Sequence, residues 1–243
     1  MSRKVLTVLA AIVLTSAAHL LAQESNLTTS FRQGNESAAQ SKWADAISAY
    51  ETLARTNTAS PALYWNWSQV ASAQGVKGEA LWAMLRARDL SPSDPTMSRE
   101  VERLRAELGL DPSEISLGLL GESRTVARRY RFDLFAIAAF LIAGLLSLGK
   151  KPRLIASHAA FLIGILLALP LWGGLWREPR GVVVHKESPL VDAPKTDAVS
   201  LSSLREGEVV PILEDQGEYF RIQDASGARG YALKSDVRKI GLD

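Results

Sequence analysis

The sequence contains no cysteine among its 243 residues. A chain without cysteine has no disulfide bond, no thiolate ligand for a metal ion and no cysteine nucleophile. Histidine is almost as scarce, because His19, His158 and His185 are the only three and lie in different segments. The sequence also lacks a glycine-rich phosphate loop, an HExxH motif and a plausible Ser–His–Asp set. It therefore predicts a protein that is not an enzyme, with no catalytic residue, no metal site and no cofactor.

A large excess of one charge sign is missing as well. The chain has 28 Lys and Arg against 26 Asp and Glu, which gives a formal net charge of +2. The basic residues gather beside apolar segments and do not form a basic face, so nucleic-acid binding is not expected.

Two long apolar runs occupy the middle of the chain, at residues 132–149 and 154–176. Only the basic turn KKPR separates them. Their lengths are close to the about 20 apolar residues that cross a bilayer. The sequence therefore predicts a two-helix transmembrane hairpin, and the fold class is a multidomain membrane protein.

The chain begins with Arg3, Lys4 and an apolar stretch, which together are typical of an export signal. Residues 1–22 are predicted to be a signal peptide or, if they are not cleaved, a signal anchor. Export of the following residues would place the N-terminal and C-terminal domains in the periplasm, joined to two spans of the bacterial inner membrane. The short KKPR turn would then be cytoplasmic.

An internal repeat with a period of 34 residues is the clearest signal in the soluble part. Ala46 recurs as Ala80, and Gly34 recurs as the equally small Ser68. The second unit also carries the spaced aromatic, small and terminating residues of a tetratricopeptide repeat: Tyr64, Trp67, Ala71, Gly75, Ala80, Ala87 and Pro92. The first unit is weaker, since Ser30 and Thr58 replace an aromatic or large residue and the final proline.

This pattern resembles a tetratricopeptide pair. We expect an all-α domain at residues 25–110, with repeats at 27–60 and 61–94 and a polar capping helix at 95–108. Tetratricopeptide arrays bind peptides along the face made by the first helix of each unit. In this register the face presents six candidate residues: Phe31, Asn35, Trp65, Gln69, Arg99 and Arg103.

Such a groove would suit an extended peptide with an acidic side chain or a C-terminal carboxylate, because it ends in two arginines. The alternative is that Phe31 and Trp65 belong to the core and that both arginines are solvated on the capping helix.

From Gly181 the pattern changes to the alternation of β-strands, with frequent turn residues. The order of the EGE, GEYF and GARGYA elements resembles a bacterial SH3-type barrel, and we expect a small all-β domain at residues 181–241. Such barrels bind peptides or cell-wall fragments, so Tyr231 is a candidate contact. The alternative is that it fills the interior of the barrel. Residues 111–131 are interpreted as a juxtamembrane linker.

The order of export signal, tetratricopeptide pair, hairpin and SH3-type domain resembles the BatE-like proteins of the Bat (Bacteroides aerotolerance) systems. The segments FRQGNESAAQSKWADAISAYETL and ALYWNWSQV are the closest part. The resemblance implies a membrane scaffold that accompanies von Willebrand A-domain proteins and a MoxR-type ATPase in an envelope complex. The alternative function is a cell-wall accessory factor whose SH3-type domain binds peptidoglycan peptides.

Overall fold

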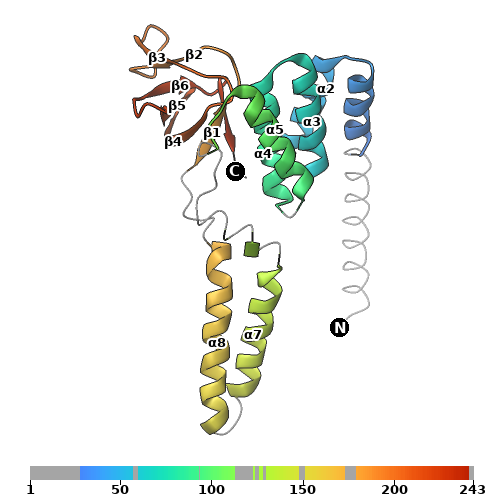
Figure 1. Cartoon of the computed structure of the whole chain (residues 1–243), viewed down its shortest axis with the longest axis vertical. Helices are drawn as coiled ribbons and strands as arrows, with labels where there is room; N and C mark the ends of the chain where they lie inside the picture. Colours follow the sequence, from blue (N-terminus) through green and yellow to red (C-terminus); the bar gives the residue numbers. More distant parts are fainter. Residues whose placement is uncertain are drawn as a thin grey trace, which may run out of the picture.

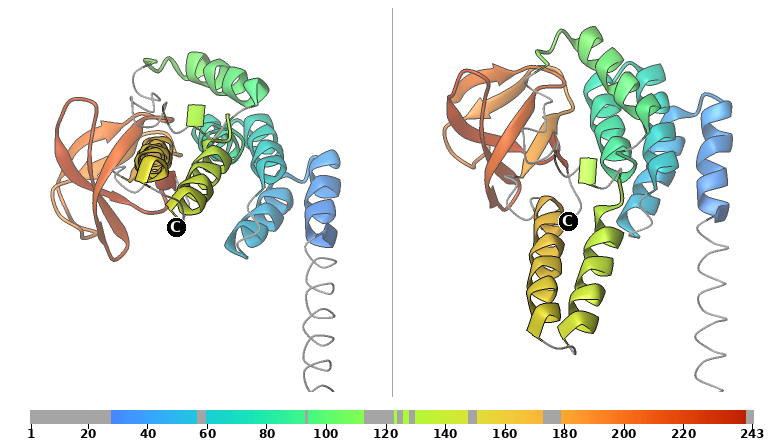
Figure 2. Two further views of the ribbon diagram at one scale, coloured as in Figure 1. Left: turned by 90° about the horizontal axis from the view of Figure 1, so that it is seen from below. Right: turned by 60° about the horizontal axis from the view of Figure 1, so that its bottom comes forward.

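The computed structural model describes residues 28–56, 60–92, 94–112, 123, 126–127, 130–147, 151–172 and 179–240. The predicted signal segment at residues 1–22 and most of the predicted linker at 111–131 lie outside the described residues. Figure 1 shows a group of helices beside a β-sheet, and a helical hairpin that extends away from both. The two turned views in Figure 2 show the same arrangement.

The helical group follows the chain, and each helix packs on the next in sequence. Its members are a helix at residues 28–39, α2 (Trp43–Arg55), α3 (Pro61–Gln74), α4 (Lys77–Leu90) and α5 (Pro95–Leu108). We call these helices the helical array. The helix α5 occupies the range in which the sequence places a capping helix.

Local capping signals explain where α3 and α5 begin and end. The side-chain oxygens of Ser60 and Asp94 accept backbone N–H bonds from the first turn, and a proline follows each cap. Each helix ends at a left-handed glycine, Gly75 at φ 84° and Gly109 at φ 68°. The helix α4 differs, because its N-cap residue is Val76, whose apolar side chain cannot accept a hydrogen bond.

Small residues let paired helices approach closely in both repeat units. A Cβ added at Gly34 would lie 2.6 Å from Cε1 of Tyr50 on α2. At the equivalent position, the Ser68 hydroxyl donates a 2.8 Å bond to the Ala80 carbonyl on α4. Tyr50, Ser68 and Ala80 are fully buried. The period of 34 residues therefore marks repeated close contacts between helices.

The C-terminal residues form an antiparallel sheet with the strand order β3-β2-β6-β5-β4-β1-β7. The strands are β1 (Arg180–Val183), β2 (Ser188–Val191), β3 (Ser200–Leu204), β4 (Val209–Gln216), β5 (Tyr219–Gln223), β6 (Arg229–Leu233) and β7 (Val237–Ile240). The pairings among these described strands leave β3 and β7 at opposite edges, so the sheet is not closed into a barrel.

The prediction of an SH3-like barrel is therefore wrong. The physical reason for the open sheet lies at the edge strand β7, which packs against α4. The Trp82 indole N–H on α4 donates a 2.9 Å hydrogen bond to the Lys239 carbonyl on β7. A side chain of the helical array thus satisfies a backbone group at this edge.

The helical hairpin consists of α7 (Phe132–Ser147) and α8 (Lys151–Trp172), which pack on each other. The Ser157 hydroxyl on α8 donates a 2.8 Å bond to the Ala143 carbonyl on α7. A Cβ at Gly164 would lie 2.8 Å from the Phe140 ring. The rest of the described hairpin surface carries many exposed apolar side chains, among them Leu141 and Ile155.

The prediction of two transmembrane helices must be corrected. Among the helices that the structure describes, none combines the length and the apolar character that crossing a bilayer requires. The helix α7 has 16 residues, fewer than the about 20 that span the hydrocarbon. The helix α8 has 22 residues but begins with Lys151, Pro152 and Arg153. This finding also contradicts the fold class of a membrane protein and the predicted location with two inner-membrane spans.

The contact between Gly34 and Tyr50 predicts a loss of stability on enlargement. Gly34→Val should lower the free energy of unfolding by about 2 kcal/mol, because the added atoms meet a fully buried ring. Chemical denaturation measures this change, and Ala39→Val at an exposed position of the same helix is the matched control. Equal stability of Gly34→Val and the wild type would contradict the close approach.

Candidate partner-binding site

Asn35 connects the first helix of the array to its two neighbours. Its Oδ1 accepts a 2.8 Å hydrogen bond from the Tyr50 hydroxyl on α2 and a 2.9 Å bond from Nδ2 of Asn66 on α3. Burial raises the pKa of the Tyr50 phenol, which keeps this donor protonated. Asn35 is therefore held in place, with its side chain half-buried between helices.

Gln69 makes an equivalent connection on the other side of α3. Its Nε2 lies 3.5 Å from Oε1 of Glu100 on α5, and its side chain is exposed. Both the pair of Asn35 with Asn66 and the pair of Gln69 with Glu100 are separated by 31 residues. We call these four residues the polar row. It runs from the helix at residues 28–39 over α3 to α5.

The two aromatic candidates take part in the core as well as in this face. Phe31 is half-buried, with its ring 6.3 Å from the ring of Tyr50. Trp65 is also half-buried and packs against the buried cluster of the array. Both rings pack against core residues, as the alternative interpretation from the sequence expects. Each ring also keeps some accessible surface beside the polar row.

The two arginine candidates lie on α5 and are engaged along their own helix. Arg103 contacts both carboxylate oxygens of Glu100, with Nε 3.0 Å from Oε2, and it also pairs with Glu107. Arg99 Nη2 lies 3.5 Å from the Thr96 hydroxyl. Because Arg103 already has two carboxylate partners, this end of the face is less suited to an acidic ligand than the sequence predicts.

The pairing with Arg103 changes the pKa of the Glu100 carboxyl. The hydrogen bond from Arg103 is the largest influence and holds the pKa of the Glu100 carboxyl below its ordinary value, although partial burial acts in the opposite direction. The hydrogen bond from Gln69 lowers this pKa further. Glu100 is thus a charged end for the polar row at neutral pH.

Tyr231 lies apart from the helical candidates. It is half-buried on β6, where it pairs with Arg221 on β5 and with Val191 on β2. In the sheet order β5, β4 and β1 separate β6 from β7, the edge strand that meets the array. The structure therefore brings six of the seven predicted residues onto the array and leaves Tyr231 on the sheet.

The sequence did not indicate a group of charged residues at the junction of array and sheet, in which Glu79 is buried and Arg238 and Glu51 are half-buried. The Arg238 guanidinium on β7 lies 5.2 Å from the Trp67 ring and 4.9 Å from the Trp82 ring. Its Nη2 is 3.2 Å from Oε1 of Glu79, and its Nη1 is 3.6 Å from Oε1 of Glu51. The Trp67 indole N–H donates a 2.9 Å bond to the same Glu79 oxygen. We call these five residues the Arg238 centre.

A sequence signal for this centre does exist. Glu79 stands in a stretch of α4 that is otherwise apolar or small, and it is 7% exposed in the structure. A carboxylate that is removed from water in this way needs a hydrogen bond or a cation. The sequence does not reveal that the cation comes from Arg238, on a strand 159 residues later.

Comparison with protein-family models gives no match for this chain, and comparison with curated proteins gives no significant match.

The pairing of Glu100 predicts a pH effect with a defined sign. A lowered carboxyl pKa stabilises the folded state above the ordinary glutamate value of about 4.3, and this contribution is lost as the pH falls through the lowered pKa. NMR titration should place the Glu100 midpoint below the ordinary value, and Arg103→Gln should move it upward. Arg55→Gln, which removes an arginine paired with Glu51, is the control. An unchanged midpoint in Arg103→Gln would refute this role of Arg103.

The Arg238 centre predicts a large change in stability. Arg238→Ala should lower the free energy of unfolding by about 3 kcal/mol, because it leaves the buried Glu79 carboxylate without its nearest cation. The control is Arg221→Ala, which removes an exposed arginine 3.6 Å from Glu214 and should cost less than about 1 kcal/mol. Similar losses from the two variants in chemical denaturation would argue against the centre.

Proposed function

We propose that this protein is a non-enzymatic adaptor whose helical array binds an extended peptide segment of a partner protein. The observation that carries this proposal is the polar row, which links the helix at residues 28–39, α3 and α5. Amide side chains offer both a donor and an acceptor, so they can pair with the backbone groups of an extended peptide. The accessible part of Trp65 would supply an apolar contact beside Gln69.

The charges on α5 refine the ligand that we propose. Arg103 is neutralised by Glu100 and Glu107, so it offers little attraction to a free carboxylate. We therefore favour a peptide that is recognised mainly through its backbone amides and one apolar side chain. A strongly acidic tail would meet Glu100 as a like charge.

The proposed partner class follows from the resemblance to BatE-like proteins. We propose a von Willebrand A-domain protein of a Bat-type assembly, in which this chain serves as a scaffold with a MoxR-type ATPase. Peptidoglycan binding by the sheet, through the half-buried Tyr231, stays a prediction. No contact among the described residues favours it over peptide binding at the helical face.

Affinity capture with the full chain tests the helical face. Trp65→Ala and Gln69→Ala should each reduce the recovery of a von Willebrand A-domain partner several-fold, because they remove the proposed apolar and amide contacts. The matched control is Trp43→Ala, since Trp43 on α2 is also half-buried against the core but lies off the polar row.

A charge variant separates this ligand class from an acidic one. Arg103→Glu should have a small effect on recovery of the partner if backbone amides dominate, comparable to Arg55→Glu on α2. A loss of binding confined to Arg103→Glu would instead indicate an acidic ligand. Unchanged recovery in Trp65→Ala and Gln69→Ala would remove the polar row as the binding site.

A further inference from the structure

The helix α4 is enclosed by both the array and the sheet. It packs against α3 and α5 within the array, and against β1 and β7 of the sheet. Its residues from Gly78 to Leu85 are all buried. In a helical array the last helices of a unit normally present a face to the next repeat. Here strands of the sheet cover a face of α4.

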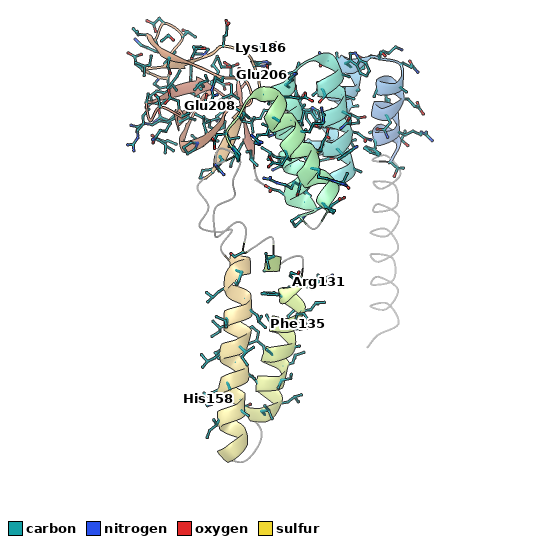
Figure 3. The ribbon with its side chains drawn as sticks, in the orientation of Figure 1. Arg131, Phe135, His158, Lys186, Glu206 and Glu208 are labelled. Carbon is teal, nitrogen blue, oxygen red and sulfur yellow. The ribbon has the colours of Figure 1, made fainter. Side chains whose placement is uncertain are left out.

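The sheet supplies the N-terminal cap that α4 lacks in its own sequence. Oε1 of Glu206 accepts a 2.8 Å hydrogen bond from the Gly78 backbone N–H in the first turn of α4. A carboxylate at this end satisfies a free donor and complements the helix dipole. Figure 3 places Glu206 on the side of the sheet that faces the helices. The start of α4 therefore depends on a residue 128 positions away in the sequence.

The turn that carries Glu206 is itself held rigidly. Glu208 is 4% exposed, and its carboxylate accepts a 3.0 Å bond from the Arg205 N–H and a 2.9 Å bond from the Ala225 N–H. These bonds tie the turn before β4 to the turn between β5 and β6. The Glu206 side chain thus starts from a backbone fixed by the sheet.

Two glycines allow a contact that leaves no room for a side chain. A Cβ at Gly78 would lie 2.4 Å from the Val183 carbonyl oxygen on β1. A Cβ at Gly207 would lie 2.5 Å from Cδ1 of Leu108 on α5, and Gly207 has a φ of 82°. Val182 belongs to the same buried cluster as the helices. The array and the sheet therefore share a core.

We infer that the array and the sheet form one cooperative folding unit, in which the sheet occupies the face of α4 that a further helical repeat would use. The α7–α8 hairpin is then an insertion within this unit, because the chain leaves the array, forms the hairpin and returns to build the sheet. The polar row and the sheet move as one body, and a partner of the array meets a fixed arrangement of both.

Hydrogen exchange of the full chain at increasing denaturant tests this inference. Segments 63–85 of the array and 209–233 of the sheet should become exchangeable at the same denaturant concentration, because both open only on global unfolding. Gly78→Val should lower both midpoints together. Glu206→Gln, a milder change, should also lower both and should speed exchange in the first turn of α4 roughly tenfold, as loss of a charge-assisted bond predicts.

The matched controls place the same changes at exposed positions. Ala73→Val lies on the exposed side of α3, and Glu218→Gln lies in the turn between β4 and β5. Neither should shift the midpoints. Separate midpoints for array and sheet in the wild type would overturn the inference. The inference would also be overturned if Glu206→Gln removed protection from α4 while the denaturation midpoint of the sheet stayed unchanged. If Gly78→Val does not fold, the result for Glu206→Gln decides the question.

Discussion

The packing of Arg238 between two tryptophans and a buried carboxylate is the interaction on which the rest of the structure depends. A guanidinium is suited to this position, because it can stack on an aromatic ring and donate to a carboxylate at the same time. Trp67, Trp82 and Glu79 belong to the array, whereas Arg238 belongs to the sheet. The buried Glu79 carboxylate would be costly to remove from water without this guanidinium.

The same centre connects the sheet to the candidate binding face. Trp67 turns to the interior of the array and contacts Glu79, while Asn66 and Gln69 on the same helix reach the neighbouring helices. The helix α3 is thus fixed on its inner side by the Arg238 centre and on its other sides by the polar row. A rigid α3 would reduce the ordering that a bound peptide must impose on the protein.

Local features of the fold could be predicted from the sequence, because they depend on neighbouring residues. Pro95 after Asp94 marks the start of α5, and Gly109 marks its end. Gly34 and Ser68 mark close helix contacts through their small size. These signals act within a turn or between two adjacent helices.

Features that depend on distant segments could not be predicted in this way. In the strand VRKI, alternation assigns Val237 to the interior and Arg238 to the surface, yet that surface meets α4. The strand pattern likewise predicts β7 but does not show that Trp82 covers its edge, and strand patterns alone do not distinguish an open sheet from a barrel. The length of an apolar run likewise predicts a membrane span, whereas the described part of α7 has 16 residues.

In the candidate site, too, some features can be predicted from the sequence and others depend on contacts between side chains. The repeat register predicts that Asn35 and Gln69 lie on the first helices of two units, but it cannot show that Arg103 is paired with Glu100. On an exposed helix face, a side chain pairs with residues three and four positions away in the sequence. These residues compete with a ligand for the same side chain.

The most direct test of the account is the exchange rate of the Trp82 indole N–H, measured by NMR on the full chain. This proton joins α4 to the Lys239 carbonyl of β7. If array and sheet are one unit held by the Arg238 centre, it should exchange only on global unfolding, together with the amides of β4 to β6. Exchange of the indole proton while those amides remain protected would contradict the account.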